Sequence, residues 1–375
     1  MSKKRILIVV NYFHPYMSGV SEYARAIAAS LAKHHEVTVL TGKHLPHLPN
    51  QEVCDGYTLF RAEPLLFLDK GYISPAFVST FKQLARQSDV INLHLPMLES
   101  GLLSILTSRP LLVTYQCDMA IVGRALSRLA VMGVRLSMRL TLARARAIVV
   151  LSKEYAISSA LVKGYHDKLV VVAPPNRFDG EVMGTQERPE SGNLICGFVG
   201  RFVLEKGIGT IVEAARLLKN EPVEFWLAGD YKDVAGGSVF DRIKSDIESL
   251  GGKVRLLGRL SNEELINFYR SIDVLLLPST NRFEAFGMVQ MEAMTFGATV
   301  VTSDMPGVRE TVRKTKIGQL CEPGSGPSLA DAIQRAQVER ASLSREEVRI
   351  AVRREFGNEK FIADYLTLVD KLSPA

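Results

Sequence analysis

The feature that most constrains the fold of this chain is the regular alternation of short apolar runs with amphipathic segments. Apolar runs long enough for buried strands occur at 5–10, 36–40, 89–94, 111–115, 147–152 and 168–173. Segments with the helical spacing of apolar residues, such as 21–34, separate them. Parallel strands that are buried on both faces read as nearly continuous apolar runs, and helices usually connect them. The pattern therefore predicts an α/β fold with parallel sheets.

The alternation stops once and then restarts. Residues 174–193 combine prolines, glycines and charges without periodicity, which is typical of a linker. Further strands are expected at 194–200, 223–229, 253–258, 273–278 and 298–303, with amphipathic helices at 207–219, 238–249, 261–270, 286–296 and 328–338. We therefore predict two Rossmann-like, doubly wound domains at 1–175 and 194–355, joined by a linker at 176–193 and facing a central cleft. Ligands of such sheets bind beyond the carboxyl ends of the strands, so the loops after the strands should carry the site.

The composition is that of an ordinary globular protein. Of 375 residues, 47% are hydrophobic and 23% are charged, which excludes a disordered, collagen-like or coiled-coil chain. The four cysteines lie far apart, so we expect a reducing compartment and neither a disulfide scaffold nor a zinc module. The apolar run near the start is too short for a signal peptide, and arginines interrupt the longer apolar stretches. We expect a cytoplasmic protein, soluble or attached peripherally to the inner face of the cell membrane.

Positive charge is concentrated in the first half of the chain. The net charge is +6, of which residues 1–190 carry +7 and residues 191–375 carry −1. At 100° per residue, a helix near 119–147 places on one stripe Arg124, Arg128, Arg135, Arg139 and Arg146. On the opposite side, facing the core, we expect Leu126, Leu129, Gly133, Leu136 and Leu140. Beside or within the stripe fall Val131, Met132, Met138 and Leu142. We predict that this stripe docks on an anionic membrane or a lipid-linked acceptor. The alternative is a solvated face that serves solubility alone.

Several motifs of nucleotide and hydrolytic enzymes are absent. The chain lacks the glycine fingerprints of dinucleotide oxidoreductases and P-loop nucleotidases, the G-x-S-x-G elbow and the H-E-x-x-H zinc motif. An Asp-x-Asp pair, which could hold a metal on a nucleotide diphosphate, is absent as well. We therefore expect fixed cations and backbone N–H groups to neutralise any bound phosphate, with no metal, no other cofactor and no nucleic-acid partner.

A basic loop follows the expected strand at 194–200. Gly200 and Arg201 end the strand, and Lys206 and Gly207 precede the next helix. One guanidinium and one ammonium group near a helix amino terminus favour a bound anion, because the free N–H groups and the helix dipole already attract one. The alternative is a solvated loop in which Glu205 pairs with one of the bases.

A glycine marks the corresponding position in the first half. Gly19 follows the strand at 5–10 and precedes an amphipathic helix, so it would let a ligand approach the backbone closely. The alternative is a simple turn in which Ser18 or Ser21 caps the helix.

Two carboxylates follow the expected strand at 273–278. Glu284 lies in a polar loop, and Glu292 lies in a helix expected to run from about Phe286. Their separation, roughly 12 Å along a helix, is too large for an acid–base pair on one bond. It suits contacts with two parts of one extended ligand, such as a sugar and a ribose across a diphosphate. The neighbouring Met291 and Met294 indicate a buried helix, in which an unpaired carboxylate is costly.

Together these motifs resemble the retaining GT-B glycosyltransferases of the glycosyl transferases group 1 family, which use nucleotide-sugar donors. The resemblance rests on Gly19, on GRFVLEKG, on E-x7-E within EAFGMVQMEAMTFG and on the following VVTSDMPGVRETV. It extends to about residue 338 and implies a metal-independent site between the two domains, with a last helix at 356–375 that returns to the first. The run RFEAFGMVQMEAM is most similar to bacterial transferases of cell-surface polysaccharide assembly, in which GDP-mannose is a frequent donor.

The resemblance implies a role for each matching residue. Arg201 and Lys206 would neutralise the donor diphosphate, where fixed cations stabilise the charge that grows on the leaving group. Glu284 would contact the transferred sugar, and Glu292 would bind the ribose. The remaining donor contacts would be the backbone of Phe286, Gly287 and Met288 at the sugar and distal phosphate, Gly19 over the diphosphate and Leu260 near the base.

Gln116 departs from the family pattern. Many relatives carry a histidine after the strand at 111–115, close to the transferred sugar, and this chain has Gln116 there with Asp118 two residues on. A glutamine amide can hydrogen-bond a hydroxyl but cannot carry positive charge. An altered sugar preference or weakened catalysis would follow. His94, at the end of another strand, is a further candidate for the acceptor or sugar side, and its alternative is a structural histidine.

Two alternatives to a transferase stay open. A nucleotide-sugar 2-epimerase would bind the same donor without transferring its sugar to an acceptor. A non-catalytic partner subunit would keep only the fold, although a catalytically dead copy has no need for Arg201, Lys206, Glu284 and Glu292 together.

Overall fold

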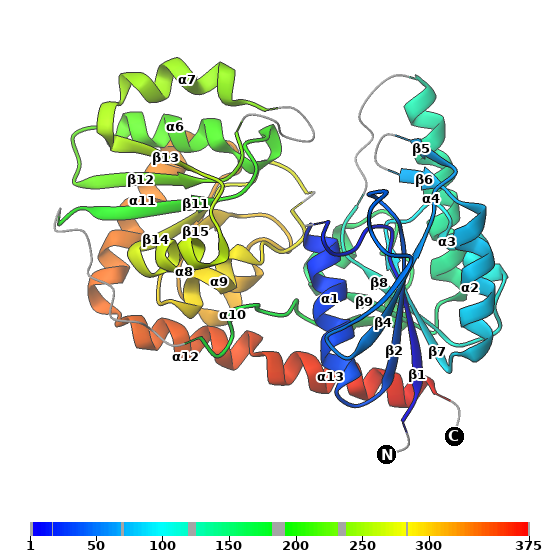
Figure 1. Ribbon diagram of the computed structural model, residues 1–375. Helices are drawn as coiled ribbons and strands as arrows, with labels where there is room; N and C mark the ends of the chain where they lie inside the picture. The colour runs from blue at the N-terminus through cyan, green and yellow to red at the C-terminus, as the bar shows by residue number, and fades with distance from the viewer. Residues whose placement is uncertain are drawn as a thin grey trace. The chain divides into compact units, whose positions relative to one another are not determined.

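The computed structural model describes residues 3–16, 18–68, 71–118, 125–181, 192–231, 238–282 and 284–373, without the side chains of residues 68 and 125–130. The chain forms two compact units, each around its own parallel sheet (Figure 1). Unit 1 comprises Met1–Pro175 and Asn358–Ala375, and unit 2 comprises Asn176–Gly357. The predicted α/β class with parallel sheets is confirmed.

Unit 1 contains an eight-stranded sheet in the order β10-β9-β8-β7-β1-β2-β4-β3. Its strands pair in parallel except at one edge, where β3 runs antiparallel to β4. The strands are β1 (Arg5–Val9), β2 (Glu36–Gly42), β3 (Gln51–Cys54), β4 (Tyr57–Ala62), β7 (Val90–Leu95), β8 (Leu111–Tyr115), β9 (Ala147–Val150) and β10 (Leu169–Val171). A separate antiparallel hairpin joins β5 (Leu66–Leu68) and β6 (Gly71–Ile73).

Helices cover both faces of this sheet, as parallel strands require. They are α1 (Gly19–Ala32), α2 (Pro75–Gln87), α3 (Ser100–Ile105), α4 (Ala125–Arg144), α5 (Lys153–Ser158), the 3-10 turn η1 (His166–Lys168) and α13 (Asn358–Leu372). Helix α1 lies on one side of the sheet, and α2 and α3 lie on the other (Figure 1). Although α13 ends the described chain, it packs on α1, where the hydroxyl groups of Tyr365 and Tyr23 lie 3.0 Å apart.

Unit 2 contains a six-stranded, fully parallel sheet in the order β13-β12-β11-β14-β15-β16. Counted from β11 in chain order, this is the 3-2-1-4-5-6 arrangement of nucleotide-binding Rossmann folds. The strands are β11 (Leu194–Val199), β12 (Val223–Ala228), β13 (Val254–Gly258), β14 (Val274–Leu277), β15 (Thr299–Ser303) and β16 (Gln319–Cys321). The order reverses between β11 and β14, and this reversal marks where a ligand is expected to bind.

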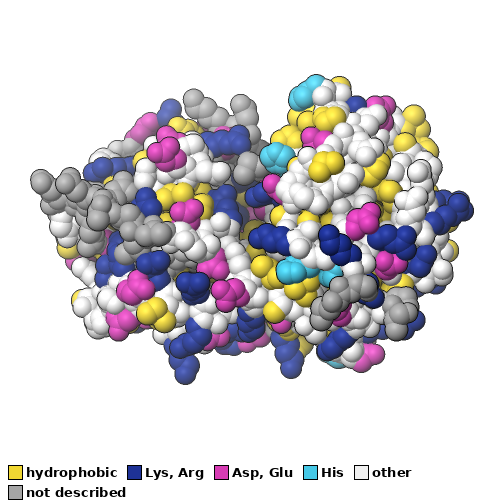
Figure 2. All heavy atoms as spheres, turned by 60° about the horizontal axis from the view of Figure 1, so that its bottom comes forward, with side chains coloured by type: hydrophobic (Ala, Val, Ile, Leu, Met, Phe, Trp, Pro, Cys, Tyr) yellow, Lys and Arg dark blue, Asp and Glu magenta, His cyan; other side chains and the backbone are white. Residues whose placement is uncertain are grey.

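Two groups of helices cover the sheet of unit 2. One group contains α6 (Ile208–Leu217), α7 (Phe240–Ser249) and α11 (Gly326–Ser342), and the other contains α8 (Asn262–Ser271), α9 (Val289–Thr295), α10 (Glu310–Thr315) and α12 (Arg345–Phe356). Short 3-10 turns precede α6 and β13, at η2 (Leu204–Lys206) and η3 (Gly251–Lys253). On the face shown in Figure 2, basic and acidic side chains of unit 2 are interspersed.

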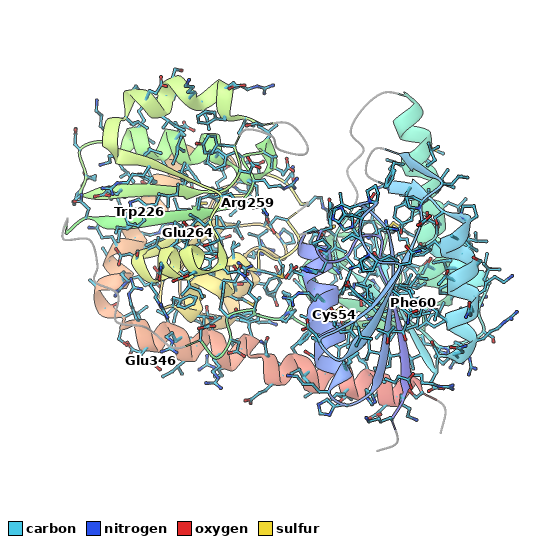
Figure 3. The ribbon with its side chains drawn as sticks, viewed as in Figure 1. Cys54, Phe60, Trp226, Arg259, Glu264 and Glu346 are labelled. Atoms are coloured by element: carbon cyan, nitrogen blue, oxygen red, sulfur yellow. The ribbon has the colours of Figure 1, made fainter. Side chains whose placement is uncertain are left out.

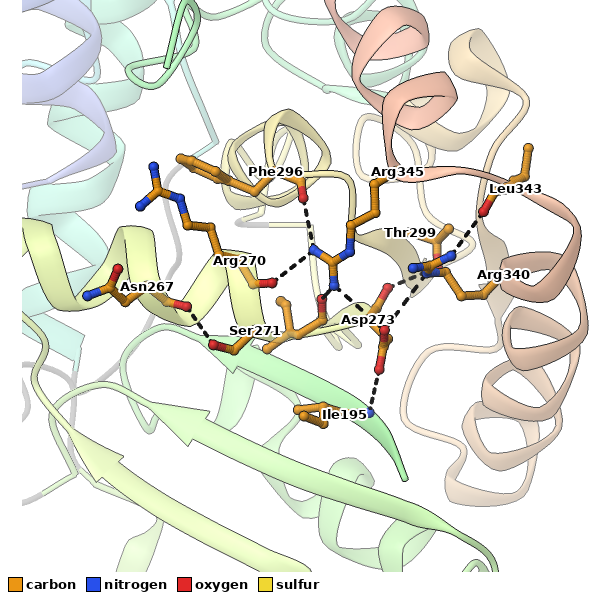
Figure 4. A network of polar contacts seen from close by, with 11 residues as sticks. Ile195, Asn267, Arg270, Ser271, Asp273, Phe296, Thr299, Arg340, Leu343 and Arg345 are labelled. Atoms are coloured by element: carbon orange, nitrogen blue, oxygen red, sulfur yellow. Dashed lines mark hydrogen bonds and ion pairs between the residues drawn. The ribbon is translucent and has the colours of Figure 1, made fainter. Parts of the chain in front are cut away.

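A buried ion-pair network ties the amino ends of the unit 2 strands together (Figure 4). Asp273, which precedes β14, accepts a hydrogen bond from the backbone N–H of Ile195 in β11 at 3.1 Å. Arg345 lies 3.6 Å from the Asp273 carboxylate and also donates to the carbonyl oxygens of Arg270, Ile272 and Phe296. Since the network lies at the end opposite the loops of the candidate site, its role is structural.

The first residues of the expected linker pack on unit 2. The Asn176 side chain donates to Thr295 Oγ1 at 2.6 Å, and the Phe178 ring packs against Tyr269 and Phe296. These contacts fix residues 176–178 on α8 and α9. Residues 182–191 of the expected linker lie outside the described residues.

Candidate active site

Two loops meet at the reversal point of the unit 2 sheet. One follows β11 and contains Arg201 and Lys206, and the other follows β14 and contains Glu284. The backbone N–H of Thr280 donates to Glu205 O at 2.9 Å, and its hydroxyl donates to Leu204 O at 3.2 Å. These bonds bring together groups that lie almost eighty positions apart in the sequence.

Gly207 makes this close approach possible. Its φ of 71° is left-handed, and an added Cβ would lie 1.9 Å from the carbonyl oxygen of Pro278. Only glycine fits such a position without displacing the backbone. The junction of η2 and α6 therefore rests directly on the end of β14.

The result of this packing is an ion pair between Lys206 and Glu284. The Lys206 ammonium group hydrogen-bonds the Glu284 carboxylate, and both side chains are mostly buried, with 22% and 16% of their surface exposed. A cation that suits phosphate and a carboxylate that suits sugar hydroxyls thus lie side by side.

Arg201 is more exposed than Lys206. Its guanidinium group lies 3.9 Å from the Glu205 carboxylate, and 53% of its side chain is accessible. The pairing with Glu205 that the sequence left open as an alternative is therefore present, at a long distance. A surface pair of this kind contributes little free energy, so it would yield easily to a stronger anion.

Residues 286–288 form a turn rather than the start of a helix. The expectation that a helix runs from about Phe286 is wrong, because α9 begins at Val289. Gly287 has a φ of 84°, which is incompatible with a helix, and an added Cβ would lie 2.2 Å from Leu277 Cδ2. Phe286 is buried, and Met288 is the N-cap residue of α9.

Glu292 is buried and has partners on unit 2. The Tyr269 hydroxyl donates to its Oε2 at 2.7 Å, and Arg177 Nε lies 3.2 Å from its Oε1. Burial, followed by the charge of Glu292, raises the pKa of Tyr269 well above its ordinary value. Sequence reasoning missed both partners, since Arg177 fell in the expected linker and Tyr269 reads as an ordinary core residue.

Leu260 lies in the short connection between β13 and α8. It is half-buried, and its neighbour Arg259 marks this connection in Figure 3. Ser261, the next residue, caps α8 through a reciprocal bond with Glu264. Leu260 thus lies at the carboxyl end of the same sheet as the loops of Lys206 and Glu284.

The candidates on unit 1 follow β1, β7 and β8. Gly19 is the first residue of α1, and Ser18 caps this helix through a reciprocal bond with Ser21. Gln116 is buried after β8, where its side-chain N–H donates to Val20 O at 3.3 Å and contacts His94 Nδ1 at 2.9 Å. These contacts place Gln116 and His94 beside the amino end of α1.

His94 is fully buried in β7. Burial lowers its pKa to about 3, so the imidazole is neutral. If the Gln116 amide donates to Nδ1, the remaining proton lies on Nε2, which has no hydrogen-bond partner among the described residues.

Asp118 is held by hydroxyl groups of unit 1. Its carboxylate accepts from Tyr115 and, at 2.7 Å, from Ser159, and its backbone N–H donates to Tyr155 Oη at 2.7 Å. These bonds occupy the carboxylate within unit 1, and they favour a positioning role for the loop after β8.

Helix α4 contains Arg128, Arg135 and Arg139 of the predicted basic stripe, and Arg146 lies just after it. Arg135, Arg139 and Arg146 are exposed, whereas Arg124 and the side chains of Leu126, Arg128 and Leu129 lie outside the described residues. The expected core-facing side is wrong: Leu136 and Leu140 are 61% and 43% exposed, whereas Met138 and Leu142 are buried. Helical geometry gives the relative directions of these residues, but the packing against β8 and α3 decides which direction is covered.

The exposed leucines of α4 belong to a larger apolar surface. Gly101 of α3 packs so closely on Ser137 of α4 that an added Cβ would lie 2.8 Å from Ser137 O. Both helices, and Leu98 just before α3, expose large apolar side chains. We call this set the α3–α4 surface: Leu98, Leu102, Ile105, Met132, Leu136 and Leu140.

Among the described residues, no three His, Cys, Asp or Glu side chains are grouped as metal ligands. Among the same residues, no helix combines the length and the apolar character needed to span a bilayer.

Two family models together match most of the chain. Residues 183–351 match the model described as Glycosyl transferases group 1, and residues 17–175 match the model described as Glycosyltransferase Family 4. The two matches correspond to unit 2 and unit 1.

Similar proteins act on different molecules. The chain is 27% identical to 2-deoxystreptamine glucosyltransferase of Streptomyces kanamyceticus over 73% of this chain and 75% of that protein. It is 26% identical to O-antigen chain mannosyltransferase C of Escherichia coli over 68% of this chain and 67% of that protein. Sucrose-phosphate synthase from Thermosynechococcus elongatus has the same fold, with a TM-score of 0.78, 22% identity and 99% of both chains covered.

Proposed function

This chain is a glycosyltransferase of the glycosyl transferases group 1 family with the GT-B fold, and we propose that it is a retaining hexosyltransferase. Its donor is a UDP- or GDP-sugar, and its acceptor is a glycan or a lipid-linked glycan in cell-surface polysaccharide assembly. The observation that carries the proposal is the Lys206–Glu284 pair at the reversal point of the unit 2 sheet. The similarity to an O-antigen mannosyltransferase supports the polysaccharide assignment.

Lys206 and Arg201 neutralise the donor diphosphate in this proposal. When the donor binds, the Lys206 ammonium group turns in part from Glu284 to the phosphate oxygens. The Glu284 oxygen that this movement releases accepts hydrogen bonds from hydroxyl groups of the sugar. Cations fixed in advance stabilise the charge that develops on the leaving diphosphate, without a metal ion. The backbone of Phe286, Gly287 and Met288 provides further contacts, while Gly19 and Gln116 stay candidates on unit 1.

Glu292 binds the ribose of the donor in this proposal. Tyr269, which holds one carboxylate oxygen, is fully buried, whereas 30% of the Arg177 side chain is exposed. A ribose therefore reaches Glu292 from the Arg177 side. Leu260 packs on the base at the end of β13.

Nucleotide release from UDP- and GDP-sugars, with and without candidate acceptors, tests the function. A transferase releases more nucleotide when an acceptor is present and forms a larger glycan. Sugar isomerisation without release would support a 2-epimerase instead. Donor binding without either reaction would support a non-catalytic subunit.

Replacing both cations tests the donor site. Arg201→Ala with Lys206→Ala should reduce kcat by several orders of magnitude, since lost charge stabilisation costs about 3 kcal/mol per group. The matched control is Arg216→Ala with Lys244→Ala, which removes two exposed cations from α6 and α7. Equal activity in the two double variants would remove the diphosphate assignment.

We further propose that unit 1 docks on an anionic membrane through the α3–α4 surface. Exposed arginines border its apolar residues, and this combination fits a bilayer whose headgroups are negative. Each basic residue near such a surface contributes about 1 kcal/mol, and the leucines add apolar burial. A lipid-linked acceptor would then be presented at the same membrane.

Sedimentation with phosphatidylglycerol vesicles tests the docking at low and high salt. Arg135→Glu with Arg139→Glu should abolish low-salt binding, and Leu136→Ser with Leu140→Ser should reduce binding at both salt concentrations. Lys244→Glu, an exposed charge reversal on α7, serves as the control. Binding that none of these changes affects would contradict the proposal.

A further inference from the structure

Unit 1 has a reversal point of its own, between β1 and β7. The strand order turns there, and the Asn11 side chain after β1 donates to the carbonyl oxygen of Pro96 after β7 at 3.5 Å. Open α/β sheets bind ligands at such a point, beyond the carboxyl ends of the strands. The loops after β1, β2 and β7 therefore frame a second candidate site, which belongs to unit 1.

An aromatic cluster lies at this point. The rings of Tyr12 and Tyr16 are stacked with their centroids 4.8 Å apart. His44, which follows β2, packs edge-on against both rings at 6.4 and 5.6 Å. Tyr72 packs against Tyr12 at 5.7 Å, and its hydroxyl donates to Asn11 O at 3.1 Å. Because Tyr72 is buried whereas 42% of Tyr16 is exposed, the cluster is anchored at Tyr72 and accessible at Tyr16.

Two polar side chains at this cluster have unsatisfied atoms. Glu99 follows β7 and buries its Oε1, and His44 buries its Nδ1. Neither atom has a hydrogen-bond partner among the residues that the structure describes. The Glu99 carboxylate lies near the cluster. Burial is the main cause of the raised pKa values of Tyr72 and Tyr12, and the charge of Glu99 raises both further. Buried polar atoms without partners are costly, and a ligand that donates hydrogen bonds would satisfy them.

We propose that Tyr12, Tyr16, His44 and Glu99 form a subsite for a neutral pyranose ring of the acceptor. A pyranose offers apolar C–H faces that pack on aromatic rings, and hydroxyl groups that donate to a carboxylate or an imidazole nitrogen. Glu99 disfavours a phosphate or an acidic sugar at the same place. The role of this sugar as an acceptor rests on the proposed transferase function, whereas its binding does not.

Saturation-transfer NMR with methyl glycosides of mannose, glucose, galactose and N-acetylglucosamine tests the subsite directly. At least one should receive saturation at its ring protons from the wild-type protein. Tyr16→Ala and Glu99→Gln should each lower the affinity for that glycoside at least tenfold. The control is Tyr165→Ala, which removes a half-buried tyrosine outside the cluster and should leave this affinity unchanged.

Kinetics then separate the subsite from the transferase function. In an active wild-type enzyme, Tyr16→Ala and Glu99→Gln should raise the acceptor KM while nucleotide release without acceptor stays unchanged. Wild-type protein that binds none of the glycosides, or variants that bind and react like wild type, would overturn the subsite. Failure of the transferase function would show itself differently, as absence of nucleotide release from every donor in the wild type.

Discussion

Individual side chains determine what each part of the proposed donor site could recognise. Glu284 is held by a flexible cation, Lys206, that a phosphate can draw away. Glu292 is held by the buried Tyr269 hydroxyl, which no ligand reaches. The two carboxylates therefore differ in how readily a ligand could displace their partners, although both belong to the same E-x7-E pattern.

Glu284→Gln and Glu292→Gln should consequently impair different steps, the transfer of the sugar and the binding of the nucleotide. Glu284→Gln should abolish most transfer while UDP or GDP binding stays nearly intact. Glu292→Gln should weaken nucleotide binding by about 1.5–3 kcal/mol, the contribution of a hydrogen bond to a charged group. Titration calorimetry with UDP and GDP measures the difference, and equal losses of nucleotide affinity would contradict the split.

His94 should make stability depend on pH. Burial lowers its pKa in the folded state to about 3, whereas an unfolded histidine titrates near 6.5. Between these values the unfolded chain binds the additional proton, so stability falls as the pH drops below about 6.5. Each pH unit removes at most about 1.4 kcal/mol. Urea unfolding between pH 7 and 4.5 should show a shallower decline in His94→Gln than in wild type, and the exposed His47→Gln should keep the wild-type slope.

At the scale of secondary-structure elements, two junctions shape the proposed donor site. The η2–α6 junction lies on the end of β14 because Gly207 has no side chain, and the turn before α9 depends on the left-handed Gly287. Both junctions present backbone and side-chain groups at the reversal point of the sheet. The rest of α6 only supports this placement.

Replacing either of two glycines, two positions apart, by alanine should therefore change the stability of unit 2 in opposite directions. Gly207→Ala should destabilise unit 2 by more than 1 kcal/mol, since it adds both left-handed strain and a clash with Pro278. Gly209→Ala should stabilise it by about 0.5–1 kcal/mol, because this exposed helical position has open space around it. Chemical denaturation compares the two, and a stable Gly207→Ala protein with full activity would disprove the close-approach argument.

At the scale of the whole molecule, polar contacts between residues far apart in the chain hold each unit together. In unit 2, Arg345 joins the buried Asp273 to three backbone carbonyl groups. In unit 1, Tyr365 of α13 bonds to Tyr23 of α1. Neither contact is visible as a local pattern in the sequence.

Arg345→Ala should destabilise unit 2 by roughly 3–5 kcal/mol, since it leaves a buried carboxylate without one of its cations. Arg354→Ala, which removes a 64% exposed guanidinium from the same helix, should change stability by less than about 1 kcal/mol. Thermal unfolding monitored by Trp226 fluorescence reports on unit 2. Equal melting temperatures for both variants would show that the network is dispensable.

The sequence predicted what depends on local composition and left out what depends on packing. Buried strands such as β1 and β14 were predictable because both of their faces are covered. The edge strand β3 was not, because its residues alternate between exposed and half-buried positions. Lys206 and Glu284 were expected in one site, whereas Arg177 was not, since its contact with Glu292 depends on the path of residues 176–178 over α9.

Helix α13 also imposes an order of assembly during synthesis. The ribosome releases residues 176–357 before residues 358–372, so unit 2 can be complete while the surface of α1 that receives Tyr365 is still uncovered. The strands of unit 1 are translated first, but unit 1 is completed last, because it needs α13. A nascent chain that stalls before residue 358 would expose Tyr23 and its apolar neighbours to chaperones and proteases, although its second unit has already folded.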